Sequence, residues 1–213
     1  MIIAIIGGSG SGKSAYAESL AVSLAGEGPL YYLATMQIYD KEGEKKAKRH
    51  RELRAGKGFI TIEQPIDIAE ATVRIEAEGS TLLLECMSNL AANEMFSEDG
   101  QKSEVFSEEE QEQEGPSEAG QKQKAGQKQE AEFVSKIMGD IWCLARESKH
   151  LIVVTNNVFE DGIEYDAATA SYMEVLGKVN ERLAKEADAV VEVVVGLPVP
   201  AKGAEILCQG ENL

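Results

Sequence analysis

An apolar run at the amino terminus leads directly into a loop of glycine and serine, and this segment limits the possible folds more than any other. Residues 2–6 are all aliphatic, and residues 7–14 have the sequence Gly-Gly-Ser-Gly-Ser-Gly-Lys-Ser, after which a helical pattern begins. Strand, loop and helix in this order form the context in which the motif G-x-x-x-x-G-K-[ST] binds phosphate. We therefore expect an α/β fold with this loop at the end of a buried strand.

Each residue type in the loop has a physical role in holding phosphate groups. Glycines allow the tight turn that points successive backbone N–H groups at an anion, and the following helix adds the positive end of its dipole. The Lys13 ammonium is expected to reach the β- and γ-phosphates, and the Ser14 hydroxyl is expected to hold Mg²⁺. The predicted nucleoside triphosphate site comprises Gly7, Gly8, Ser9, Gly10, Ser11, Gly12, Lys13 and Ser14.

The rest of the chain alternates between short apolar runs and longer amphipathic segments. All of these apolar runs except residues 30–34 are rich in Val, Ile or Leu with little polar alternation, which is typical of strands buried on both faces. We predict strands at residues 2–6, 30–34, 81–84, 151–155 and 189–195, and helices at residues 14–25, 43–55, 66–77, 132–148 and 167–187. This alternation indicates a mostly parallel β-sheet flanked by helices, the α/β architecture of P-loop NTPases.

Residues 96–132 differ in composition from the rest of the chain. They include 11 acidic and 4 basic residues, and the pentapeptide Ala-Gly-Gln-Lys-Gln occurs at residues 119–123 and again at residues 125–129. Such a segment buries too little apolar surface to offset its ordering entropy, so we interpret it as a disordered or weakly helical insert. We expect residues 1–213 to form a single nucleotide-binding domain that carries this insert.

The chain has a formal net charge of −16, which disfavours DNA or RNA as a partner because phosphate backbones favour basic surfaces. No apolar run approaches the roughly 18 residues that a membrane span requires, and the apolar start lacks a basic leader. Cys86, Cys143 and Cys208 lie too far apart for a metal-ligand motif. These features predict a protein of the reducing cytoplasm.

An acidic residue at the end of a second buried strand is expected beside the phosphate loop. The apolar run of residues 81–84 ends in Glu85, and a carboxylate at the tip of a buried strand is well placed to hold Mg²⁺ with Ser14. The alternative is a glutamate at a strand end that faces solvent. The phosphate loop elsewhere in the chain favours the first interpretation.

The most basic stretch of this acidic chain, residues 45–54, surrounds His50. His50 and Arg54 are four positions apart, so the two would share one face of a helix. A neutral imidazole is a competent nucleophile toward phosphorus, and nearby arginines can neutralise charge on a phosphoryl transition state. The alternative is a solvated basic helix face, and this stretch alone does not decide between the two.

Several segments, in order along the chain, resemble those of a known enzyme family. Besides residues 7–14, they are Tyr32-Leu33-Ala34-Thr35 with Asp40 and Glu42, His50-Arg51-Glu52-Leu53-Arg54, Thr61-Ile62-Glu63-Gln64-Pro65, Leu82-Leu83-Leu84-Glu85-Cys86, Val153-Val154-Thr155-Asn156, residues 177–188 and Gly196-Leu197-Pro198. On these segments the chain resembles the bifunctional adenosylcobinamide kinase/adenosylcobinamide-phosphate guanylyltransferase family of adenosylcobalamin (vitamin B12) biosynthesis. The segments cover most of the chain outside the insert.

The resemblance implies two activities. The first phosphorylates the aminopropanol hydroxyl of adenosylcobinamide with ATP or GTP, and the second transfers GMP from GTP to that phosphate and releases pyrophosphate. The family's guanylyl transfer passes through a covalent histidine–GMP adduct, and His50 stands at the matching position. The resemblance also implies a homo-oligomer, a trimer.

By the same resemblance, the nucleotide site extends beyond the phosphate loop. The added residues are Ala34, Thr35, Met36, Arg51, Glu52, Leu53, Arg54, Glu63 and Glu85, with Lys13 and His50 as the catalytic residues and Ser14 and Glu85 holding Mg²⁺. The chain also departs from the family pattern: Glu85 replaces an aspartate, Asn157 replaces a glutamate, and Met173 stands where an arginine is expected. The last two departures bear on the kinase activity.

Two other functions remain open from the residues themselves, because a phosphate loop does not reveal which group is transferred. One is a P-loop kinase of another small molecule, which would label only an added acceptor. The other is a GTP-binding regulatory or scaffold protein that recruits a partner through residues 96–132.

Overall fold

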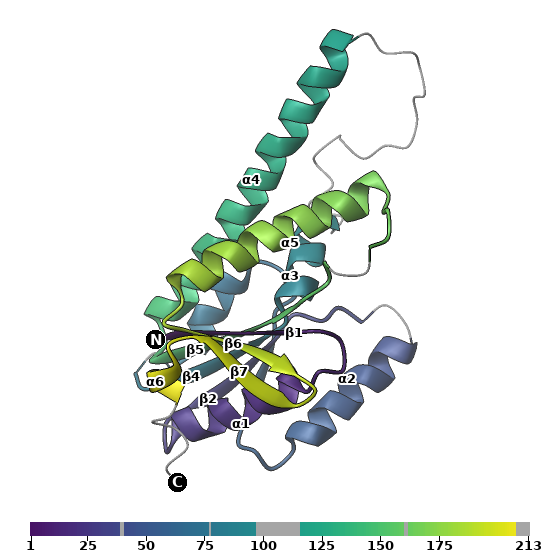
Figure 1. Cartoon of the computed structure of the whole chain (residues 1–213). Coiled ribbons are helices and arrows are strands. Elements are labelled where there is room, and N and C mark those ends of the chain that lie inside the picture. Colours follow the sequence, from purple (N-terminus) through teal and green to yellow (C-terminus); the bar gives the residue numbers. More distant parts are fainter. Residues whose placement is uncertain (39–40, 77, 97–115, 160–161, 208–213) are drawn as a thin grey trace.

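The computed structural model describes residues 1–38, 41–76, 78–96, 116–159 and 162–207, with the backbone alone at 41–42, 46–47, 50, 53 and 116–125. One seven-stranded sheet organises these residues (Figure 1). Its strands are β1 (Ile2–Gly7), β2 (Leu30–Ala34), β3 (Ile60–Glu63), β4 (Thr81–Glu85), β5 (His150–Asn156), β6 (Ala189–Val194) and β7 (Leu197–Lys202). The order is β3-β2-β4-β5-β1-β6-β7, and only the β6–β7 pair is antiparallel among these strands.

Helices cover both faces of the sheet (Figure 1). The helices are α1 (Lys13–Ala25), α2 (Lys41–Arg54), the 3₁₀ helix η1 (Ile68–Arg74), α3 (Met87–Phe96), α4 (Pro116–Arg146), α5 (Ala167–Glu186) and α6 (Ala204–Leu207). Helices α3, α4 and α5 pack on one face, and α1 packs on the other. The expected α/β architecture, a mostly parallel sheet flanked by helices, is confirmed.

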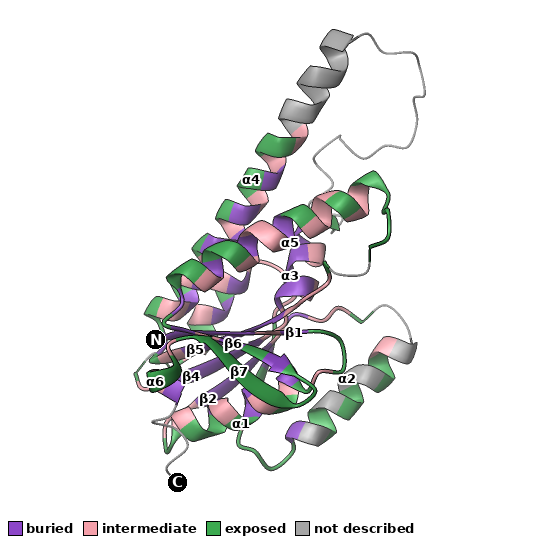
Figure 2. Ribbon diagram, viewed as in Figure 1, coloured by how far each residue is buried: buried purple, intermediate pink, exposed green. Residues whose placement is uncertain are grey.

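The two-sided packing explains the unbroken apolar runs in the sequence. Side chains alternate between the two faces of a strand, so Leu82 and Leu84 enter the core beneath α3, α4 and α5 while Leu83 enters the core beneath α1. All three leucines are fully buried, as are the central strands in Figure 2. A strand with no solvent-exposed face has no place for polar alternation.

Four elements lie outside the predicted pattern, namely β3, β7, α3 and the four-residue helix α6. The edge strand β3 is short and exposes three of its four residues, and β7 contains two prolines and is exposed along its whole length. Edge strands of this kind carry little apolar signal. Helix α3 is short and follows β4 after a single residue. The sequence therefore shows no loop between the apolar run of β4 and the start of α3.

The segment at residues 66–77 is a 3₁₀ helix over Ile68–Arg74 rather than the predicted α-helix. Asp67 precedes it in the left-handed conformation, with φ at 48°. The Thr72 hydroxyl donates to the Ala69 carbonyl at 2.7 Å, a local bond that competes with α-helical pairing.

The predicted insert at residues 96–132 divides into three parts. Phe96 is the last residue of α3, residues 97–115 lie outside the described part of the chain, and residues 116–132 belong to α4. The helix predicted to begin at residue 132 therefore begins at Pro116. Proline suits the first turn of a helix, and the Ala, Gln, Lys and Glu that follow have high helix propensity.

The described helices contain no segment that is both long and apolar enough to cross a bilayer. Cys86 and Cys143 carry free thiols, and Cys208 lies outside the described residues.

Candidate functional site

A cavity of about 590 Å³ opens at the carboxyl ends of the central parallel strands, where the phosphate loop and the last turns of α2 also meet. Ligands in open α/β sheets bind at this edge. Ten of the residues predicted for the nucleotide site line this cavity. They are Ser9, Gly10, Lys13, Ser14, Ala34, Met36, Arg51, Arg54, Glu63 and Glu85.

The phosphate loop connects β1 to α1 through a backbone that requires glycine. Gly10 and Gly12 have φ of 73° and 90°, in the left-handed region that favours glycine. A Cβ on Gly7 would lie 2.8 Å from the Val193 carbonyl oxygen. The Gly196 N–H donates to the Ser11 carbonyl at 2.8 Å, so the turn between β6 and β7 braces the loop from outside.

The Lys13 side chain is folded back over the loop. It is 8% exposed, and its ammonium donates to the Gly8 carbonyl at 3.1 Å. Burial lowers the pKa of Lys13, against the opposing effects of Cys86 and Glu85. A desolvated cation on the cavity wall is strongly attracted to an entering phosphate.

Ser14 and Glu85 form the pair that the sequence predicted as the metal site. The Ser14 hydroxyl donates to Oε1 of Glu85, whereas Oε2 of Glu85 is buried and has no hydrogen-bond partner among the described residues. Burial raises the pKa of Glu85, although the hydrogen bond from Ser14 opposes that rise. A hydroxyl and a carboxylate with one oxygen to spare fit Mg²⁺, which prefers oxygen ligands.

Helix α2 brings a basic surface to the same cavity. Arg51 lies 3.6 Å from the Glu63 carboxylate, and the Arg54 guanidinium lies over the Tyr32 ring, 3.4 Å from its centre. His50 belongs to α2, one residue before Arg51. The side chains of His50 and Leu53 lie outside the described part of the chain.

Other predicted residues support the cavity from behind or stand away from it. The Thr35 hydroxyl accepts from the Cys86 N–H and donates to the Cys86 carbonyl, each at 2.8 Å, which holds β2 against the end of β4. Glu52 is exposed and lies 3.9 Å from Lys48. Gly7, Gly8, Ser11 and Gly12 shape the loop behind its lining residues.

The cavity also has lining residues that sequence reasoning did not assign to the site. They are Tyr32, Ile38, Gly43, Thr61, Cys86, Asn89 and Asn156. Asn156 could have been found, because it is the polar residue that ends the apolar run of β5. Its side-chain amide donates to the Ser88 hydroxyl at 2.5 Å, and that hydroxyl lies 3.0 Å from the Cys86 sulfur.

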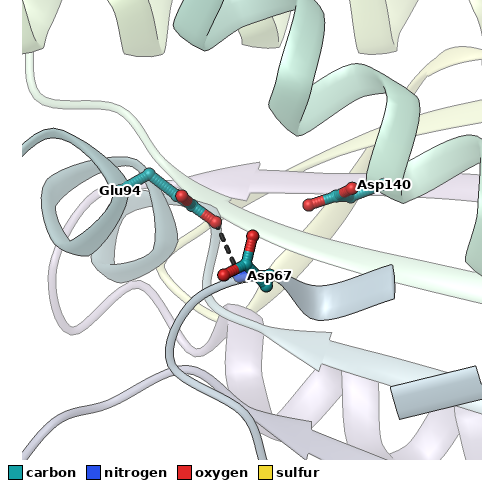
Figure 3. Close-up of side chains that lie close together, drawn as sticks. All are labelled: Asp67, Glu94 and Asp140. Atoms are coloured by element: carbon teal, nitrogen blue, oxygen red, sulfur yellow. Dashed lines mark hydrogen bonds between the residues drawn. The ribbon is translucent and has the colours of Figure 1, made fainter. Parts of the chain in front are cut away.

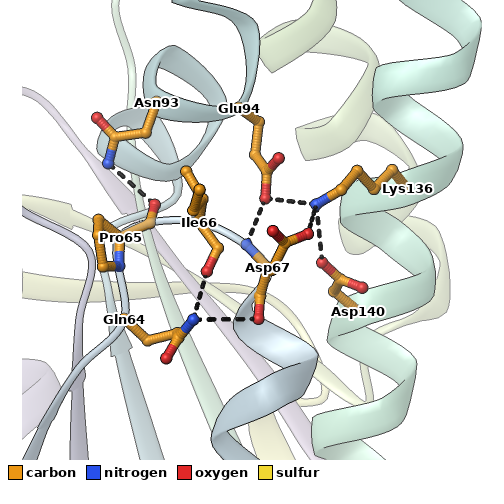
Figure 4. A network of polar contacts seen from close by, with 8 residues as sticks. All are labelled: Gln64, Pro65, Ile66, Asp67, Asn93, Glu94, Lys136 and Asp140. Carbon is orange, nitrogen blue, oxygen red and sulfur yellow. Dashed lines mark hydrogen bonds and ion pairs between the residues drawn. The ribbon is translucent and has the colours of Figure 1, made fainter. Parts of the chain in front are cut away.

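A second acidic cluster lies away from this cavity, between η1, α3 and α4. Figure 3 shows Asp67, Glu94 and Asp140 with their carboxylate oxygens facing one another. Figure 4 shows the Lys136 ammonium between them. The ammonium lies 2.7 Å from Asp67, 2.6 Å from Glu94 and 3.4 Å from Asp140.

The ammonium of Lys136 takes the place that a metal ion would need, so we interpret the cluster as an ion-pair network. Burial works against its charge, but hydrogen bonds to Asp67 and Glu94 raise the pKa of Lys136. Glu94 also accepts the Asp67 N–H at 2.7 Å. The network fixes the segment after β3, and Asn93 adds a bond to the Pro65 carbonyl at 3.0 Å (Figure 4).

The sequence is similar to those of characterised bacterial proteins. The bifunctional adenosylcobalamin biosynthesis protein CobP of Pseudomonas aeruginosa is 29% identical over 202 residues, which cover 93% of this chain and 96% of that protein. CobU of Escherichia coli, also named a bifunctional adenosylcobalamin biosynthesis protein, is 29% identical over 202 residues, with 95% and 100% coverage. CobU of Salmonella typhimurium is 27% identical over 203 residues, again with 95% and 100% coverage.

Solved structures with a similar chain path include the flagellar accessory protein FlaH from Methanocaldococcus jannaschii. It has a TM-score of 0.43 and 13% identity, over 94% of this chain and 77% of that chain. A solved ATPase domain also has a TM-score of 0.43, with 11% identity over 90% of this chain and 68% of that chain.

A family model described as cobinamide kinase / cobinamide phosphate guanyltransferase matches residues 3–201. This match includes the phosphate loop, the end of β4 and the whole of α2. The chain therefore belongs to the cobinamide kinase/cobinamide phosphate guanylyltransferase family.

Proposed function

We propose that this chain is a bifunctional enzyme of adenosylcobalamin biosynthesis. It phosphorylates adenosylcobinamide with ATP or GTP, and it then transfers GMP from GTP to the resulting phosphate. Family membership supports both activities. One structural observation carries the proposal: the Ser14–Glu85 pair, Lys13 and the arginines of α2 all line one cavity.

In the kinase reaction, the acceptor hydroxyl oxygen bonds to the γ-phosphorus, the bond to the β-phosphate oxygen breaks, and the hydroxyl proton is released. Lys13 would stabilise the charge that develops on the phosphates. Mg²⁺ held by Ser14 and Glu85 would neutralise part of the same charge. Asn157 stands where the family has a glutamate, and its backbone N–H donates to the Gly7 carbonyl at 3.1 Å.

In guanylyl transfer, a ring nitrogen of His50 bonds to the α-phosphorus of GTP, and pyrophosphate leaves. An oxygen of the acceptor phosphate then bonds to that phosphorus, and the imidazole leaves. Two displacements replace one, and the protein holds the GMP between them. The position of His50 on α2 supports this role, because Arg51 and Arg54 on the last turns of that helix line the nucleotide cavity.

Intact-mass spectrometry after exposure to GTP and Mg²⁺ tests the transferase activity. We expect an added mass equal to one guanylyl group (GMP less one water), stable in base and labile in acid, and its disappearance when phosphorylated cobinamide is added. A chain that modifies only an added acceptor would instead be a kinase of another substrate. A chain that binds GTP and modifies neither itself nor an acceptor would be a regulatory protein.

We also propose that the enzyme acts in the cytoplasm as a homo-oligomer, a trimer by resemblance to the family. The exposed edge of the sheet supports association, because Leu197 on β7 is 65% exposed and Val199 lies on the same strand. Sedimentation velocity across a range of protein concentrations measures the assembly, and a purely monomeric protein would contradict this part of the proposal.

A further inference from the structure

A second cavity of about 440 Å³ lies next to the nucleotide cavity and shares a wall with it. Arg51, Arg54 and Thr61 line both cavities. Ala55, Gly56 and Gly58 from the turn after α2, together with Phe59, complete the second one. Its lining thus contains two arginines and no acidic residue among the described ones.

Arg54 is the residue that gives the second cavity its chemical character. It is 6% exposed, and its Nε and Nη1 are buried with no hydrogen-bond partner among the described residues. One face of the guanidinium is covered by the Tyr32 ring. Arg54 also lines the second cavity, and the forked geometry of a guanidinium suits a phosphate or carboxylate.

The turn beside Arg54 is held in place while the space in front of it stays open. Lys57 lies 2.6 Å from the buried carboxylate of Glu18 on α1, which ties the turn to the helix that follows the phosphate loop. Gly56 and Gly58 have φ of 82° and 83°, and a Cβ on either would contact nothing within 4 Å. A fixed turn, an open space and an unpaired buried cation are what a preformed anion site requires.

We propose that the second cavity binds the phosphate monoester of the acceptor, with Arg54 as the forked donor. This inference rests on the proposed function, and it adds a binding site for the second substrate of guanylyl transfer, the phosphorylated acceptor. The nucleotide phosphates already have their own cradle in the phosphate loop and Lys13, so a further unpaired arginine points to a further anion. The shared wall places the acceptor phosphate beside the nucleotide, at the end of the helix that carries His50.

The first test adds a repelling charge to the second cavity alone. Ala55 is exposed and does not line the nucleotide cavity. We expect Ala55→Glu to raise the KM for phosphorylated cobinamide at least tenfold, while the rate of protein–GMP formation from GTP changes less than twofold. Ala131→Glu, a matched change at an exposed position of α4, should alter neither quantity. An unchanged KM in Ala55→Glu, or an equal loss in both steps, overturns the proposal.

The second test measures binding directly, by equilibrium dialysis of cobinamide and phosphorylated cobinamide in the absence of nucleotide. The wild-type protein should prefer the phosphorylated form at least tenfold, Arg54→Met should lose that preference, and Arg54→Lys should keep part of it. Circular dichroism shows whether each variant is folded, and Ala55→Glu provides the same comparison if Arg54→Met is not. A preference that survives in these variants overturns the proposal. Because no GTP is present, this result is independent of whether the protein forms a GMP adduct.

Discussion

Two clusters of charged side chains, the Lys136 network and the group that lines the nucleotide cavity, bury charge in opposite ways. In the cluster at η1, α3 and α4, the Lys136 ammonium contacts three carboxylates, and Glu94 also accepts a backbone N–H. In the nucleotide cavity, Arg54 and Glu85 keep buried polar atoms that have no partner among the described residues.

The difference separates a cluster that stabilises the fold from one that is prepared for ligands. An unpaired buried polar group costs free energy, so it persists where a ligand completes it. Removing a residue from the closed Lys136 network should therefore reduce stability. Removing one from the open cavity should reduce binding or chemistry and leave the stability of the free protein unchanged or higher.

The largest expected effect is on the chemistry at the open cavity. His50→Ala should abolish the protein–GMP adduct, a loss of at least about a thousandfold, because no other group would carry the nucleotide. Labelling with α-phosphate-labelled GTP measures this loss. His150→Gln, which changes a histidine at the start of β5, should label normally, and labelling of His50→Ala would falsify the assignment.

The next effect is on nucleotide affinity. Lys13→Met should raise the Kd for GTP at least about a hundredfold, because it removes a desolvated ammonium from the phosphate site. The free energy of unfolding without ligand should not fall, since the variant also removes a buried charge. Calorimetric titration and urea denaturation measure the two quantities, with the exposed Lys149→Met as control. If Lys13→Met lowered the free energy of unfolding but kept the affinity for GTP, Lys13 would stabilise the fold, as the Lys136 network does, rather than bind the nucleotide.

The closed network should show the reverse behaviour. Lys136→Met leaves three carboxylates facing one another, so we expect the free energy of unfolding to fall by about 1–2 kcal/mol, with the half-exposed position reducing the effect. The Kd for GTP of the folded variant should stay within about twofold of wild type. Lys185→Met, which breaks an exposed pair with Glu181, should cost less than about 0.5 kcal/mol. Equal losses in both variants would contradict the comparison.

The smallest expected effect is a pH dependence of the stability of the free protein, which arises from the buried Glu85 carboxyl in the nucleotide cavity. Because burial raises the pKa of Glu85, the native state holds its proton more tightly than the unfolded chain does. Stability without ligand should therefore fall as pH rises from about 4.5 through the raised pKa. Glu85→Gln removes that fall and should be more stable than wild type by on the order of 1 kcal/mol above this range.

Urea denaturation of both proteins at several pH values, without nucleotide or Mg²⁺, measures this difference. It should shrink toward zero as pH falls below about 4.5, where the carboxyl becomes protonated in both states. A Glu85→Gln variant that is less stable than wild type at pH 8 would mean that the charged carboxylate stabilises the free protein.

The parts of the fold that could be predicted are those whose residues are determined by local burial. Strands β1, β2, β4, β5 and β6 appear where continuous apolar runs predicted them, because β1, β2, β4 and β5 are covered on both faces and β6 buries one face. The edge strands β3 and β7 could not be found in this way, because most of their residues are exposed and they carry little apolar pattern.

The candidate site shows the same division. The phosphate loop could be recognised because its geometry is local and requires glycines at fixed positions. Tyr32 and Asn89 join the cavity through the order of strands in the sheet, which no spacing in the sequence reveals. The Lys136 network could not be predicted from the sequence either, because it joins three elements that meet only in the folded chain.

The bond from Gly196 to the phosphate loop has a consequence for how the enzyme is made. The motif is synthesised well before the turn that braces it, because Ser11 precedes Gly196 by most of the folded domain. A ribosome-bound fragment that stops before β6 would contain the complete motif without its final shape. Tight GTP capture would then mark the moment at which the hairpin of β6 and β7 closes on the loop.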